Sequence, residues 1–204
     1  MTIETAVTPS SGVRRYGWWL TMAMATFVAL ASTRYLAGGA LMTPPPLKAN
    51  FFAHPLAFYV HITAASTALL IGPWQFVDRL RRKSPQLHRR LGTVYVVACL
   101  TGGLASMIMA PGSNGGWLSA AGFLTLAVLW LWTTGMALVA IRARRVADHR
   151  RWMRRSYALT LAGVTLRLYL PLAFIGLVPF STAYAWIAWL CWVPNLLLID
   201  RIAR

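Results

Sequence analysis

Six long apolar runs occupy most of this 204-residue chain and limit the folds that it can adopt. They lie at residues 17–39, 55–77, 91–110, 118–141, 156–178 and 183–199. A helix needs about 20 mostly apolar residues to cross the hydrocarbon core of a bilayer. Only helices and closed barrels can span lipid, because every backbone polar group must be paired within the protein. Runs of this length and continuity favour helices over alternating barrel strands. We therefore predict an all-α, polytopic membrane protein built as a six-transmembrane-helix bundle.

The basic residues give this bundle an orientation. Of the 20 Lys and Arg residues, 17 lie on one side, before the first run, at residues 79–90 and 142–155, and at the C-terminus. The opposite loops carry only Lys48. Because basic residues in short loops stay in the cytoplasm, both termini are predicted to be cytoplasmic.

The net charge of +16 would indicate a nucleic-acid partner in a soluble protein. Here the charges flank membrane spans, so we expect membrane lipids with anionic headgroups at the cytoplasmic face as partners, and no nucleic acid. Residues 1–13 are polar and are predicted to form a flexible cytoplasmic tail. Residues 14–204 are predicted to form a single six-helix membrane domain.

Several residues mark where the predicted helices begin or bend. Ser84 is predicted to be the N-cap of the third membrane helix, whose first residue is then Pro85. Asp148 is predicted to be the N-cap of the fifth membrane helix. Pro73, Pro171 and Pro194 lie inside apolar runs, where each can kink its helix.

His61 and Arg167 are ionisable residues inside predicted membrane helices, and such residues are functional candidates by default. The helical rise places His61 roughly 9 Å and Arg167 roughly 16 Å below the same outer boundary. We predict a polar pocket in the outer half, lined by His61, Arg167, Tyr59, Tyr169 and Arg34. It would suit a small anionic or quinone-like ligand. The alternative is that Arg167 only bonds helix carbonyls and braces the bundle.

His88 and His149 form a second constellation at the predicted cytoplasmic face. Each is expected on the first turn of its helix, and each is followed by arginines that could pair with haem propionates. Two imidazoles that face each other across a bundle can ligate the iron of a haem. The alternative is that both histidines are solvated contacts to lipid headgroups.

Acidic residues are scarce, and the sequence shows no machinery for hydrolysis. Glu4, Asp78, Asp148 and Asp200 are the only carboxylates, and no Asp lies in the middle of a predicted helix. We expect Asp78 and Asp200 to pair with arginines. The sequence contains no phosphate-binding glycine loop, metal-binding cysteine cluster or nucleophile elbow.

Two stretches of the chain resemble a known family. The matching segments are His61–Ile62, Leu69–Phe76, Arg79–Arg81, Leu87–Val96, His149–Thr160 and Thr165–Leu168. They resemble the bacterial membrane-protein family catalogued as domain of unknown function 2306, over roughly residues 55–175. The resemblance implies a polytopic inner-membrane protein and no established activity.

A weaker likeness is to the six-helix, ascorbate-reducible b-type cytochromes, whose haem ligands pair helix 2 with helix 4 and helix 3 with helix 5. His54 or His61 matches the helix 2 ligand, and His88 and His149 match the ligands of helices 3 and 5. The run at residues 118–141 contains no histidine. The likeness therefore implies at most one haem b, ligated by His88 and His149.

Two functional hypotheses follow from these residues. The first is a b-type-cytochrome-like protein with a redox or electron-transfer function. The alternative is a cofactor-free membrane protein, either a small-molecule transporter or an assembly or scaffold subunit. Transporters often bind substrate near the midplane beside a broken helix, and Pro171 follows Arg167 by one helical turn.

Overall fold

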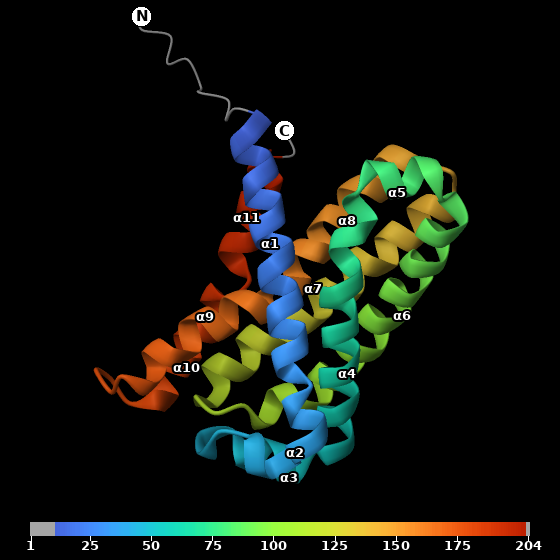
Figure 1. Cartoon of the computed structure of the whole chain (residues 1–204). Coiled ribbons are helices and arrows are strands. Elements are labelled where there is room, and N and C mark those ends of the chain that lie inside the picture. The colour runs from blue at the N-terminus through green and yellow to red at the C-terminus, as the bar shows by residue number, and fades with distance from the viewer. Residues whose placement is uncertain (1–10, 203–204) are drawn as a thin grey trace, which may run out of the picture.

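The computed structural model describes residues 11–202, and every regular element in that part of the chain is helical. The elements are α1 (Ser11–Ser32), α2 (Arg34–Met42), η1 (Pro45–Leu47), α3 (Lys48–Ala53), α4 (Pro55–Ile71), η2 (Gly72–Phe76), α5 (Asp78–Lys83), α6 (Pro85–Met109), η3 (Ala110–Gly112), α7 (Gly116–Arg142), α8 (Val146–Thr160), α9 (Ala162–Phe174), α10 (Phe180–Leu190) and α11 (Val193–Ile202). Figure 1 shows their arrangement.

Five helical segments are long and apolar enough to cross a membrane. They are Pro55–Phe76, Pro85–Gly112, Gly116–Arg142, Val146–Phe174 and Phe180–Arg201. The number of spans is six if α1 and α2, which meet at a bend of 56°, are counted together as one. The prediction of an all-α, polytopic membrane bundle is therefore confirmed, with the difference that its first span is bent.

Two predicted helix boundaries differ from the structure. The first membrane helix begins at Ser11, before the predicted domain start at residue 14, and residues 1–10 of the predicted tail lie outside the described residues. The prediction of Asp148 as an N-cap is wrong, because α8 already begins at Val146. Asp148 lies in the first turn of α8 and pairs with Arg145 at 3.2 Å.

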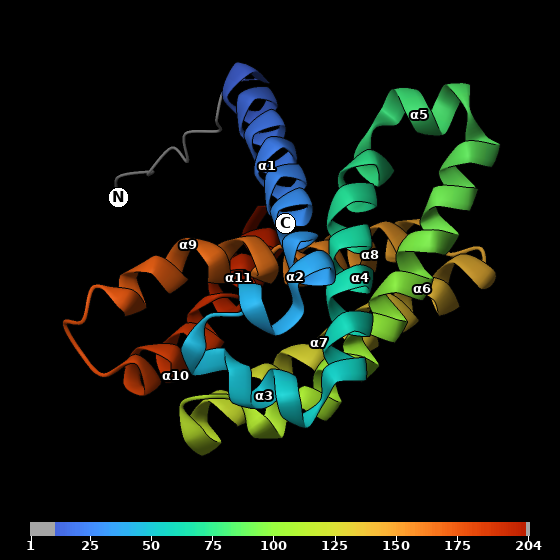
Figure 2. The ribbon, with the colours of Figure 1, turned by 60° about the horizontal axis from the view of Figure 1, so that its bottom comes forward.

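The last two apolar runs are broken, although both read as continuous in the sequence. Leu161 separates α8 from α9, and Cys191 and Trp192 separate α10 from α11. The break at Leu161 does not lie at a proline, since Pro171 is inside α9. By contrast, Pro194 is the second residue of α11 and has no N–H to donate to the carbonyl of Leu190, where α10 ends. Figures 1 and 2 show that α9 and α10 project from one side of the bundle, away from α5 and α6.

The core of the bundle forms where α4, α6, α7 and α8 pack together. Small residues permit this approach: a Cβ at Gly102 of α6 would lie 3.1 Å from Ala64 of α4 and 3.4 Å from the ring of Trp130 in α7. In membranes, where the hydrophobic effect does not drive helices together, such close packing is a main source of association. By contrast, α1 attaches through a small cluster that includes Ala25, Val28 and, on α9, Val164.

The start of α1, the end of α11 and α5 lie at one end of the bundle, and α2 and α3 lie at the other (Figure 1). The basic loops share the first end, which the positive-inside rule predicts to face the cytoplasm.

Reporter fusions test this orientation. Fusions at Lys48, Ser113 and Ser181 should read as periplasmic, and fusions at Lys83, Ala147 and Arg204 as cytoplasmic. One reversed loop between two correctly oriented neighbours would contradict the six-span arrangement.

Candidate functional site

A cavity of about 250 Å³ lies beside the core, in the half of the bundle that holds α2 and α3. Its walls come from α1, α2, α4, α6, α7, α8, α9 and α10, together with the loop that contains η1 and α3. Most of the lining is apolar. The polar side chains that reach it include Tyr35, His61, Ser66, Thr160, Arg167 and Tyr184. Few polar groups on an apolar wall are typical of a small-molecule site.

Arg167 is the one strongly charged side chain on this cavity wall. Its Nη1 donates to the carbonyl oxygen of Gly163 at 3.0 Å, one turn earlier in α9. No carboxylate within residues 11–202 pairs with it, because Asp78, Asp148 and Asp200 form ion pairs with Arg81, Arg145 and Arg155. A guanidinium carries five N–H donors, so Arg167 has donors left for a ligand.

His61 lines the same cavity from α4. Its Nδ1 lies 3.0 Å from the carbonyl oxygen of Gly102 in α6. A carbonyl oxygen only accepts hydrogen bonds, so Nδ1 must carry the proton of this contact. In the neutral ring, Nε2 is then a hydrogen-bond acceptor. The site thus combines a fixed donor group, Arg167, with an acceptor, His61.

The structure brings His61 and Arg167 together on the wall of this cavity, which Arg34, Tyr59 and Tyr169 do not line. Arg34 lies on a neighbouring groove, which Arg167 also lines. Tyr59 and Tyr169 line neither the cavity nor the groove. Tyr59 packs against Phe51, with their ring centroids 5.8 Å apart.

The cavity has polar residues that the sequence analysis did not single out. Tyr35 and Tyr184 take the place that Tyr59 and Tyr169 were expected to fill, and Ser66 and Thr160 add hydroxyl groups. Of these, only Thr160 belongs to a stretch that carried the family resemblance. Tyrosine is common in membrane helices, and nothing in the sequence distinguishes the two that face the cavity.

A buried network of hydroxyl groups begins at Thr160 and leads into the core. The Tyr95 hydroxyl lies 2.9 Å from Thr160 Oγ1 and 3.0 Å from Ser156 Oγ, and Ser156 Oγ lies 2.7 Å from Thr134 Oγ1. The indole N–H of Trp130 donates to Thr160 at 2.9 Å. Three helices, α6, α7 and α8, are joined at this point. The network satisfies polar groups for which lipid offers no partner.

His88 and His149 lie on the first turns of α6 and α8, as predicted. His149 Nδ1 is 2.8 Å from the carbonyl oxygen of Ala137 in α7, which leaves Nε2 free as a ligand atom. His88 Nδ1 is buried and has no hydrogen-bond partner among the described residues. Both histidines lie near the starts of their helices, at the end of the bundle that holds α5.

Comparison with known proteins identifies a family and no activity. A family model described as "Predicted membrane protein (DUF2306)" matches residues 58–202. Neither the curated proteins nor the solved structures contain a match to this chain. The matched segment includes His61, Arg167, His88 and His149.

The tyrosine network makes a prediction about stability. Tyr95→Phe removes two hydrogen bonds from the core, and we expect it to lower the free energy of unfolding by about 1–2 kcal/mol. Tyr157 supplies a matched control, because its hydroxyl is buried without a partner and Tyr157→Phe should be neutral or stabilising. The two variants are compared by thermal unfolding in the same detergent. An equal decrease in stability in both variants would contradict a structural role for the network.

Proposed function

Because the chain belongs to the DUF2306 family of predicted membrane proteins, whose description names no activity, we propose a function from the geometry of the site. The protein binds a small anionic or quinone-like molecule in the cavity between α4 and α9 and acts as a small-molecule carrier of the bacterial inner membrane. The observation that carries this proposal is Arg167, a cation on the cavity wall with no carboxylate partner within residues 11–202.

The energetic argument starts from the position of Arg167. A cation within a membrane helix is costly unless it finds a partner or reaches water. Its contact with the Gly163 carbonyl uses one donor and does not neutralise the charge. An anion in the cavity would supply both the missing acceptors and the opposite charge, through charge-assisted hydrogen bonds. The arrangement therefore favours ligand binding over a purely bracing role.

His61 favours a ligand that also carries a hydrogen-bond donor near its charged end. With Nδ1 engaged by Gly102, Nε2 accepts a hydrogen bond. A ligand with a hydroxyl or protonated acid group near its charged end can donate to it. Quinol hydroxyls and carboxylic or phosphoric acids meet this requirement, and the apolar walls suit the rest of such a molecule.

Binding assays on the purified protein test this proposal. Inorganic phosphate, a short-chain carboxylate and a short-chain benzoquinone are added separately to the protein in nanodiscs. A binding ligand at 100 times its Kd should stabilise the fold by about 2.7 kcal/mol, which thermal unfolding detects. Arg167→Gln should abolish the effect. Arg79→Gln, which changes an exposed arginine far from the cavity, should leave it intact. Equal stabilisation of both variants would sink the proposal.

A second candidate function is haem ligation by His88 and His149. It is favoured by the free Nε2 of His149, the buried, unpartnered Nδ1 of His88 and the position of both residues on the first turns of their helices. A haem held there would supply one-electron redox chemistry, and the chain's own part would be to orient the His149 ring through Ala137.

An optical spectrum tests haem binding directly. Protein purified from haem-replete cells should show a Soret band that shifts on reduction, and His88→Ala or His149→Ala should remove it. His54→Ala is the matched control, because His54 lies between α3 and α4 at the other end of the bundle. The absence of a Soret band from the wild-type preparation would exclude the haem proposal and leave the cavity proposal unaffected.

A further inference from the structure

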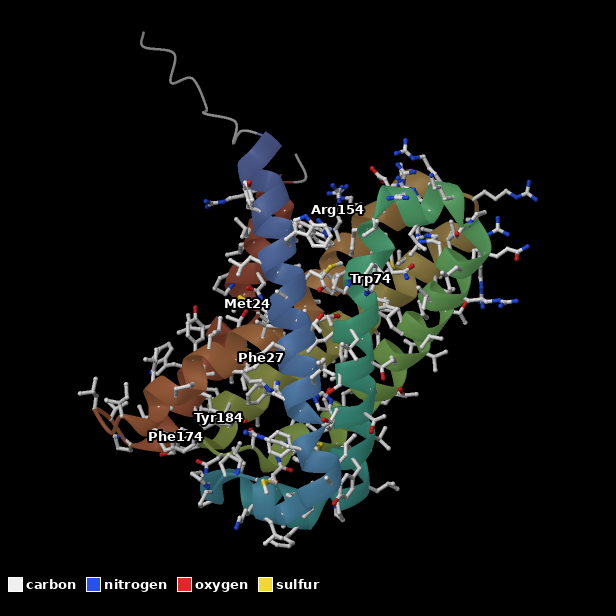
Figure 3. All side chains as sticks on the ribbon, in the orientation of Figure 1. Met24, Phe27, Trp74, Arg154, Phe174 and Tyr184 are labelled. Carbon is white, nitrogen blue, oxygen red and sulfur yellow. The ribbon has the colours of Figure 1, made fainter. Side chains whose placement is uncertain are left out.

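A groove of about 810 Å³ runs along the bundle between α1 and α9, next to the cavity. Its apolar walls include Phe27 and Ala31 on α1 and Leu168, Pro171 and Phe174 on α9. Figure 3 shows Met24 and Phe27 on the side of α1 that faces α9, with Phe174 across the gap. The groove exists because α1 contacts α9 near its start, through Val28 and Val164, and α9 then leads away (Figure 1).

The groove opens on the surface that lipid covers. Phe27 is 72% exposed and Phe174 is 50% exposed, and both lie on segments long and apolar enough to cross a membrane. Large exposed aromatic side chains on such segments meet acyl chains, not water. A molecule that enters here therefore comes from within the bilayer.

The groove and the cavity adjoin each other and share four lining residues. Tyr35, Pro44, Arg167 and Leu170 line both. Arg167 thus stands at the junction between the lipid-facing groove and the interior. The volume of the cavity, about 250 Å³, is below the roughly 300–1,000 Å³ typical of sites that enclose a drug-sized ligand. The cavity has room for a compact head group, while the groove has room for a chain.

The groove and the adjoining cavity carry basic side chains and no acidic ones. Arg34 lies at the groove, where its Nη2 donates to the Tyr35 hydroxyl at 2.9 Å and its guanidinium carbon is 4.9 Å from the centre of the Tyr35 ring. Arg167 lines the same groove. No acidic residue lines the groove or the cavity. Two neighbouring cations between apolar walls complement an anionic head attached to an apolar tail.

We propose that the groove between α1 and α9 is a lateral portal for an anionic amphiphile, a phosphate or carboxylate carried on an acyl or isoprenoid chain. Its head group lies between Arg34 and Arg167, and its chain occupies the groove. This inference rests on the proposed function, since it names the ligand class and the entry route of the same cavity. It adds that the ligand arrives from the bilayer and not from water.

The charge requirement is tested first, on the full chain in phosphatidylcholine nanodiscs with a photoreactive phosphatidic acid as the probe. We expect saturable cross-links to α1 and α9 at the groove. Arg167→Gln should weaken the apparent affinity by roughly 10- to 100-fold, the effect of losing a charge-assisted hydrogen bond. Arg34→Gln should cost less than about fivefold, because Arg34 is exposed. Equal labelling by a photoreactive phosphatidylcholine would overturn the inference.

The entry route is tested by blocking the groove after the protein has folded. Ala31→Cys places a thiol on the groove but not on the cavity, and the native Cys99 and Cys191 are fully buried. Labelling of the unmodified Ala31→Cys variant is the reference with which the modified variant is compared. Reaction with a bulky maleimide should reduce labelling at least about tenfold, by the steric cost of filling the groove. Val128→Cys, exposed on α7 and outside both linings, should tolerate the same reagent.

Glycerol 3-phosphate is a water-soluble anion with the same head group and no acyl chain. Competition by this compound therefore distinguishes a ligand that enters from water from one that enters from the bilayer. We expect it to compete weakly with the phosphatidic acid probe. If it competes fully, and blocked Ala31→Cys still binds the probe, the portal is overturned while Arg167-dependent binding and the proposed function stand. If neither anion depends on Arg167, both proposals fail.

Discussion

A buried network of hydroxyl groups around Tyr95 joins the central helices of this protein. Tyr95 is completely buried, and its hydroxyl bridges Ser156 and Thr160 of α8, while Thr134 of α7 bonds to Ser156. Within lipid these groups have no water to replace a lost partner, so a slip of one helix would leave several of them unsatisfied. The polar contacts thereby fix the relative positions of α6, α7 and α8. The remaining helices pack around a core whose geometry is already set.

The cavity follows from how those remaining helices attach. α9 and α10 lie outward from the core (Figure 2). Because α1 holds to α4 and to the start of α9, it cannot follow α9 along its whole length. The divergence leaves a groove on the lipid side and a cavity on the inner side, with Arg167 at their junction. Thr160 belongs both to the network and to the cavity wall, so the rigid core also shapes the site.

The charge balance explains why Arg167 differs from the other arginines. Most basic residues lie at the end of the bundle that also holds α5, where water and lipid headgroups can solvate them. Arg155 is partly buried there, and Asp200 binds it through two hydrogen bonds of 2.8 and 3.2 Å. The described aspartates all lie near that end and are all engaged. Arg167 is out of their reach, and no carboxylate within residues 11–202 neutralises it.

The sequence by itself determined the class of the protein and the residues most worth examining. Run length and charge distribution predicted the spans, because the thickness of a bilayer and the cost of charge inside it act on any chain alike. The same cost singled out His61 and Arg167. Only the tertiary structure decided which tyrosines face the cavity, that α8 and α9 part at Leu161, and that Tyr95 meets residues more than 60 positions away in the chain. Those features depend on how each helix is rotated about its axis and on which helices become neighbours. Packing sets both, and a run that is apolar on every side carries no periodic signal from which its rotation can be read.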